Sequence, residues 1–173
     1  MNFSKEINSA AKFIAGVILI HVVTYFLAGI FATSVLGSGQ YYPPSPNAVS
    51  YFRDPMSPHV QSLLIPAAIV RGLLYALALY PFRRRIMELG QLYGGLAVTG
   101  LAFIMGWVAA AGGIIEHYVF LAPMPLGFII ISFIEILLQT LLFGQFLIMW
   151  EKRFNLNYYS RLNLRKSSSF PSY

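Results

Sequence analysis

Four long apolar segments constrain this chain more than any other feature. They cover residues 13–36, 60–82, 92–115 and 126–150. A helix needs about 20 residues to cross the hydrocarbon core of a bilayer, which is about 30 Å thick. Hydrophobic residues make up 57% of the chain and charged residues only 10%, which leaves too little polar surface for a soluble domain. The sequence therefore predicts an all-α, polytopic integral membrane protein with four transmembrane helices in an antiparallel bundle, formed by residues 1–154.

The basic residues predict the orientation of this bundle. Ten of the twelve Lys and Arg residues flank the apolar segments on one side of a four-span topology: Lys5, Lys12, Arg83, Arg84, Arg85, Lys152, Arg153, Arg161, Arg165 and Lys166. Because cytoplasmic flanks are enriched in Lys and Arg, we expect both termini to be cytoplasmic, in a membrane such as the bacterial inner membrane. The net charge of +6 is thereby explained by membrane flanks, and it does not indicate nucleic-acid binding.

The segments outside the predicted spans are an external loop and a tail. The loop, residues 37–59, is rich in Pro, Gly, Ser and Asn, which predicts irregular structure. Its aromatic residues Tyr41, Tyr42, Tyr51 and Phe52 are expected to lie on the bilayer surface, with docking onto a partner as the alternative. Ser57 followed by Pro58 is typical of a helix start. Residues 155–173 are polar and basic, and they predict a flexible cytoplasmic tail.

Polar side chains recur inside the apolar segments. Arg71 lies near the middle of the second segment and Glu135 near the middle of the fourth, at matching expected depth. An ionisable side chain at that depth costs about 2.5–3.5 kcal/mol even on a lenient scale, so we expect the two to pair inside the bundle. The remaining members of the predicted polar layer share helix faces with these two or lie at a similar level: His21, Tyr25, Tyr75, Ser132 and Gln139.

Two interpretations of this layer stay open. It is either a buried ion pair with hydrogen-bonding neighbours that fixes how the helices pack, or a site for a proton, an ion or a ligand. Double replacement of Arg71 and Glu135 by apolar residues would separate the two, because a purely structural pair can be removed as a unit.

The third segment carries a stripe of small residues along one predicted helix face: Gly95, Thr99, Ala102, Gly106, Ala109 and Gly113. Such a stripe lets two helix backbones approach closely. We expect it to pack inside the chain's own bundle, and contact with another subunit is the alternative.

Metal and cofactor signals are weak. Asp54, His59, Glu116 and His117 fall on the same predicted external side and are residue types that bind divalent ions, but their spacing matches no known motif. His21 has the residue type of an axial haem ligand, but the apolar segments contain no second His or Met pattern that would complete a haem site. The chain has no cysteine, which excludes disulfides and thiolate sites. No metal or cofactor is predicted.

No catalytic motif is present, neither a nucleophile elbow nor a phosphate-binding glycine loop. The sequence therefore favours a non-enzymatic protein, either an accessory or structural subunit of a membrane complex or a homo-oligomeric bundle, with lipid and other membrane subunits as its partners. The alternative is a proton-coupled or small-solute transporter that uses the polar layer. A cofactor-binding or lipid-modifying enzyme is a third hypothesis.

Overall fold

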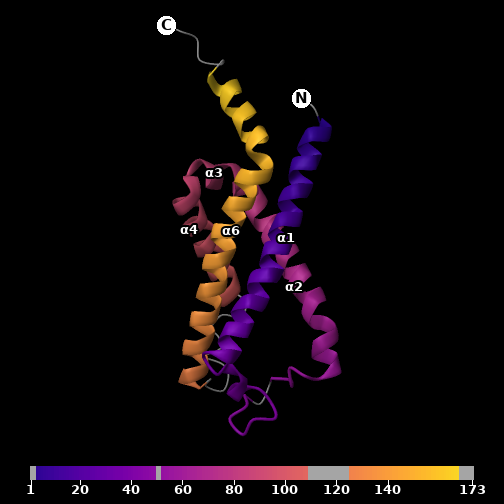
Figure 1. The fold of residues 1–173 in the computed structure, drawn as a ribbon, viewed down its shortest axis with the longest axis vertical. Helices are drawn as coiled ribbons and strands as arrows, with labels where there is room; N and C mark the ends of the chain where they lie inside the picture. The colour runs from indigo at the N-terminus through magenta and orange to yellow at the C-terminus, as the bar shows by residue number, and fades with distance from the viewer. Residues whose placement is uncertain (1–2, 50–51, 109–124, 168–173) are drawn as a thin grey trace.

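The computed structural model describes the backbone of residues 3–49, 52–108 and 125–167, and every regular element in those ranges is helical (Figure 1). The elements in chain order are α1 (Phe3–Ser34), η1 (Ser38–Tyr41), α2 (Pro58–Leu79), η2 (Tyr80–Phe82), α3 (Arg83–Glu88), α4 (Gly90–Phe103), the π-helical segment η3 (Ile104–Val108) and α6 (Leu126–Ser167).

Among the described residues, three stretches of helix are long and apolar enough to cross a membrane: Glu6–Ser34, Pro58–Glu88 and Leu126–Phe154. They indicate a membrane protein and correspond to the first, second and fourth predicted segments. The third predicted segment begins as α4 and η3, and its last part, residues 109–115, lies outside the described residues.

The observed helix ends follow local chemistry. The Ser57 hydroxyl accepts a hydrogen bond from the Val60 amide at 3.4 Å, and Pro58 occupies the first turn, so α2 begins as its sequence predicts. α6 continues to Ser167, well beyond the predicted end of the fourth span at residue 150 and into the segment where we expect a flexible tail. Neither Gly nor Pro interrupts the chain between Gly144 and Pro171, which allows this extension.

Both chain termini lie at the same end of the molecule (Figure 1). This terminal end holds the start of α1, helix α3 and the last part of α6, while η1 and the connection to α2 lie at the opposite loop end. The hydrophobic core is formed by α1, α2, α3, α4 and α6 together, and its buried members are Phe13, Val17, Ile20, Tyr75, Ala76, Leu79, Ile86, Val98, Ala102, Phe143, Leu147 and Ile148.

The small-residue stripe packs α4 against α6. The Thr99 hydroxyl donates to the Thr140 carbonyl at 3.0 Å and also lies 2.9 Å from the Gly95 carbonyl. A Cβ atom at Gly144 would collide with the Gly95 carbonyl, which shows how closely the two backbones approach. Ala102 is fully buried in the same region. The described part of the stripe therefore serves packing within the chain, whereas Ala109 and Gly113 lie outside the described residues.

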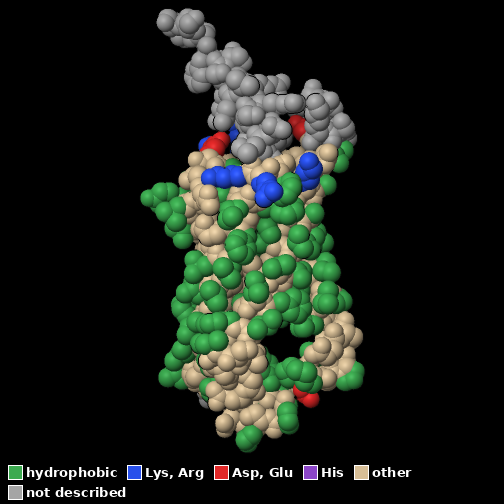
Figure 2. All heavy atoms as spheres, in the orientation of Figure 1, with side chains coloured by type: hydrophobic (Ala, Val, Ile, Leu, Met, Phe, Trp, Pro, Cys, Tyr) green, Lys and Arg blue, Asp and Glu red, His purple; other side chains and the backbone are tan. Residues whose placement is uncertain are grey.

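α1 and α2 cross closely and then separate. An ideal Cβ at Gly72 would lie 3.0 Å from the Ile18 Cα atom, so the two backbones nearly touch there. Toward the loop end they diverge (Figure 1), and Figure 2 shows the molecule open between α1 and the first half of α2, with hydrophobic side chains around this α1–α2 opening. From Gln61 to Ala67 all residues of α2 are exposed except the half-buried Leu64.

The aromatic residues of the external loop pack on the chain itself. Tyr42 stacks on Phe52 with ring centroids 4.9 Å apart, and Phe52 lies 5.1 Å from Phe128 near the start of α6. Tyr41 contacts the same Phe128 ring at 5.6 Å. These rings join the loop to α6, where the sequence suggested only the bilayer surface or a separate partner, while Tyr51 lies outside the described residues.

Candidate intramembrane binding site

A histidine on α1 and a glutamine on α6 form the centre of the predicted polar layer. The Gln139 Nε2 atom lies 3.4 Å from His21 Nδ1, and both side chains are buried. Imidazole and carboxamide groups can satisfy each other in this way inside an apolar bundle, since either group carries both donors and acceptors. The structure thus brings together two residues that the sequence places on different helices.

The second nitrogen of His21 has no protein partner among the described residues. Its ring lies edge-on to Tyr75, 4.9 Å between centroids, and edge-on to Phe143 at 5.9 Å. The Nε2 atom is fully buried without a hydrogen bond. A buried polar atom without a partner is uncommon and destabilising, so it marks a position where a further group can bind.

Arg71 lies beside the Tyr25 ring, with its Cζ atom 5.9 Å from the ring centroid. The side chain is exposed on the surface of the protein. The expected Arg71–Glu135 ion pair is not formed: the described part of the chain places no carboxylate oxygen within 4.0 Å of the Arg71 guanidinium. Matching depth along two helices did not bring the charges into contact: Arg71 lies beside Tyr25 and Glu135 beside Gly29, one turn apart on α1.

Glu135 lies against α1 one turn farther toward the loop end than Tyr25. Its Oε1 atom is 3.9 Å from the ideal Cβ position of Gly29, two turns beyond His21 toward the loop end. Tyr42 of the external loop is nearby, and its pKa is raised above the usual value by burial first and by the Glu135 charge second. Glu135 therefore belongs to the loop end of the bundle, and Ser132, also half-buried, precedes it by one turn of α6.

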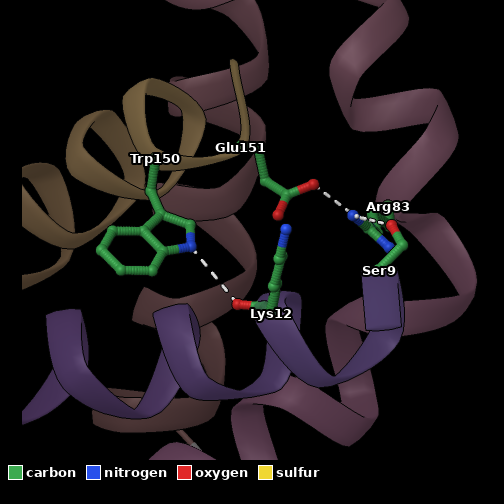
Figure 3. A network of polar contacts seen from close by, with 5 residues as sticks. All are labelled: Ser9, Lys12, Arg83, Trp150 and Glu151. Carbon is green, nitrogen blue, oxygen red and sulfur yellow. Dashed lines mark hydrogen bonds and ion pairs between the residues drawn. The ribbon is translucent and has the colours of Figure 1, made fainter. Parts of the chain in front are cut away.

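The ion pair that is buried in the structure joins Arg83 and Glu151 at the terminal end. Figure 3 shows Arg83 between Glu151 and Ser9, with Nε–Oε2 at 2.7 Å and the second contact, to the Ser9 hydroxyl, at 3.0 Å. Both charged side chains are almost fully buried, 7% and 1% exposed. Trp150 donates to the Lys12 carbonyl at 3.3 Å in the same region.

Together with Ser9, this pair joins three helices that are far apart in sequence, α1, α3 and α6. The Arg83 guanidinium also lies 4.9 Å from the Phe13 ring centroid, which adds an aromatic face to its surroundings. The sequence interpretation missed the pair, because Arg83 looks like its exposed neighbours Arg84 and Arg85, which bind Glu88 at the surface. Glu151 was the signal in the sequence that could have revealed the pair, because it is a single acidic residue next to the basic residues that follow the fourth span.

The weak metal hypothesis gains no support from the described residues. Asp54 uses its Oδ1 atom to accept the Met56 amide at 2.8 Å, in a local turn. The described part of the chain contains no group of three metal-binding side chains. Glu116 and His117 lie outside it, and His59 is exposed at the start of α2.

Comparison with known proteins adds nothing to this geometry, since no family model, no curated protein and no solved structure matches the chain.

Proposed function

We propose that this chain is a non-enzymatic membrane protein that binds an anionic ligand at Arg71, inside the bilayer. The proposal rests on one observation: the Arg71 guanidinium, midway along α2, lies beside an aromatic ring and has no carboxylate oxygen of the described residues within 4.0 Å. A charge at that depth is costly without a counter-charge. An oxyanion would supply the counter-charge, and a guanidinium binds oxyanions through paired, charge-assisted hydrogen bonds.

His21 and Gln139 support the proposal as neighbours of this site. His21 is the residue of α1 that lies one turn before Tyr25, and its unpartnered Nε2 atom can take part in a further hydrogen bond. Glu135 of the polar layer lies one turn of α1 farther toward the loop end, beside Gly29.

Ligand-dependent stabilisation tests the proposal. Purified protein in a non-ionic detergent is heated with inorganic phosphate, sulfate, octanoate or short-chain phosphatidylglycerol. A ligand at about 100 times its Kd stabilises the folded state by about 2.7 kcal/mol, so at least one anion should raise Tm in the wild type and not in Arg71→Gln. If every anion acts equally on both proteins, Arg71 is not an anion site.

The topology proposed with this function has four spans and cytoplasmic termini, in a membrane such as the bacterial inner membrane. Its support is that Lys and Arg side chains gather at the terminal end, where Figure 2 shows them in blue, and that both termini lie at this end. A reporter fusion placed after Gly37 should report the external side, and one placed after Arg153 the cytoplasmic side. The same side for both would overturn the four-span topology, and the reverse assignment would overturn the orientation.

A second candidate is the accessory-subunit function. The exposed stretch of α2 from Gln61 to Ala67 favours it, because an apolar helix segment without intramolecular packing offers a surface to another membrane protein. Photocrosslinkers at Leu63 and Ile65 in native membranes should then capture one protein of constant mass. Capture of lipid alone would leave the ligand-binding function as the better account.

A further inference from the structure

Trp150 of α6 lies across the seam between α1 and α6 at the terminal end. An ideal Cβ atom at Gly16 would collide with its indole ring, so the ring rests directly on the α1 backbone. The indole nitrogen donates to the Lys12 carbonyl at 3.3 Å (Figure 3). Trp side chains are enriched at the headgroup level of bilayers, and Trp150 lies near the end of the apolar stretch Leu126–Phe154. The contact therefore marks where the surface of the membrane meets the α1–α6 seam.

Two cations lie one helical turn beyond this contact. α1 begins at the terminal end and α6 runs toward it (Figure 1). Lys12 precedes Gly16 by four residues, and Arg153 follows Trp150 by three, so both lie about one turn closer to the terminal end. The Arg153 guanidinium lies 6.0 Å from the Phe154 ring centroid, and that ring lies 4.3 Å from the Trp150 ring. Both cationic side chains are exposed, and they come from different helices at the same level.

The charges of these two side chains are not neutralised within the described part of the chain. Lys12 points toward Glu151 in Figure 3, but that carboxylate is bound by Arg83 at 2.7 Å. No carboxylate oxygen of the described residues lies within 4.0 Å of the Lys12 or Arg153 side chain. The seam therefore attracts a negative group from outside the chain.

The surface on the other side of Trp150, toward the middle of the spans, is apolar. Phe146 lies one turn before Trp150 on α6 and is 39% exposed, and Leu19, three residues after Gly16 on α1, is 52% exposed. From the middle of the membrane to the terminal end, the seam thus carries apolar side chains, then an indole ring and then two cations. A phospholipid in a bilayer has the matching order, with acyl chains in the hydrocarbon core and the phosphate at the surface.

We infer that the α1–α6 seam binds an anionic phospholipid of the leaflet at the terminal end, with its phosphate between Lys12 and Arg153 and an acyl chain along Leu19 and Phe146. A headgroup with net negative charge is favoured, because a zwitterionic headgroup would bring a cation of its own to the two cations of the seam. This site is separate from the one proposed at Arg71 and goes beyond that function.

The fluorescence of Trp150 tests this inference. The chain has two tryptophans, so Trp107→Phe leaves Trp150 as the single emitter. This variant of the full chain is reconstituted in mixtures of phosphatidylcholine and phosphatidylglycerol in which one lipid carries bromine in its upper acyl chain, which quenches an adjacent indole. Brominated phosphatidylglycerol should quench Trp150 at a lower fraction than brominated phosphatidylcholine does.

Substitutions in the Trp107→Phe background locate the lipid. Lys12→Gln and Arg153→Gln should each lower the relative affinity for phosphatidylglycerol about fivefold, the factor expected for one basic side chain near a bilayer surface. Arg85→Gln is the matched control. It removes an exposed charge at the same end of the molecule, but Arg85 is already bound by Glu88 at 2.9 Å, so the relative affinity should stay unchanged.

Three results would overturn the inference. The first is equal quenching by the two brominated lipids, and the second is a preference for phosphatidylglycerol that survives the combined Lys12→Gln and Arg153→Gln substitutions. The third is loss of the preference in Arg85→Gln or in Arg71→Gln, which would place the anionic lipid elsewhere. Should the combined variant not fold, salt decides the question: at about 1 M salt, where charges are screened beyond about 3 Å, the preference should fall, and an unchanged preference contradicts the site.

Discussion

Gly72 of α2 lies directly against Ile18 of α1, with only 3.0 Å between the ideal Cβ position of the glycine and the Ile18 Cα atom. This contact fixes where the two helices cross. It also decides what lies next to the crossing, because Arg71 precedes Gly72 and Tyr25 lies two turns after Ile18 on α1. One missing side chain thereby sets the position of the cation at the end of the α1–α2 opening.

Enlarging Gly72 should loosen this crossing. Gly72→Leu introduces a side chain where backbone atoms already stand, and overpacking of this kind costs about 1–3 kcal/mol. Thermal unfolding in detergent measures the loss. Gly100→Ala is the matched control, since a Cβ there meets nothing within 4 Å and alanine favours a helix by up to about 1 kcal/mol. Equal stability of the two variants would show that α1 and α2 do not touch at Gly72.

The Arg83–Glu151 pair should be far more important than its surface neighbours. Glu151→Ala leaves the buried Arg83 without its carboxylate, which costs about 3–5 kcal/mol. Arg84→Ala breaks only an exposed pair with Glu88 and should cost at most about 1 kcal/mol. Chemical unfolding of both variants in the same detergent gives the comparison. The double variant Arg83→Met with Glu151→Leu should recover most of the loss, and failure to recover would point to Ser9 or to other contacts of the pair.

The His21–Gln139 contact predicts coupling between two helices. Gln139→Leu removes the group beside His21 Nδ1 and should cost about 1–3 kcal/mol, because both ring nitrogens are then buried without partners. Adding His21→Leu removes the stranded ring, so the double variant should be more stable than the sum of the single losses predicts. A double-mutant cycle in thermal unfolding measures this difference. Strict additivity would mean that the two side chains do not interact.

Alkaline pH should weaken the loop end through Tyr42. Burial and the Glu135 charge raise the pKa of its phenol, so the folded protein holds this proton to higher pH than the unfolded chain does. The stabilisation is complete below the unfolded value of about 10 and is lost as pH rises toward the folded value. Tyr42→Phe keeps the stacking on Phe52 and should be less sensitive to pH above about 10 than the wild type. Identical pH profiles would contradict this assignment.

The sequence predicted the helical class well, and three of its four predicted spans overlap the three long apolar helices that the structure describes. The length of an apolar segment depends on composition alone, so the spans could be predicted directly from the sequence. The start of α2 at Ser57 and Pro58 could also be predicted, because it depends only on neighbouring residues. In the small-residue stripe, Gly95 and Thr99 pack against α6, where close backbone approach requires small side chains.

Pairing between helices could not be predicted in the same way. Depth along a helix follows from residue number, but the direction a side chain faces depends on how the helices cross, and the Gly72–Ile18 contact sets that crossing. For this reason Arg71 and Glu135 were expected to meet and do not. Arg83 was predicted only as one of the basic residues that flank the spans, and in the structure it is buried and paired with Glu151.

A structure of the protein in a phosphatidylglycerol bilayer tests the central claim most directly, through the density beside the Arg71 guanidinium. Our account predicts an oxyanion within about 3 Å of the guanidinium nitrogens. A Glu135 carboxylate bound to Arg71, with α2 closed against α1 along its first half, would contradict it.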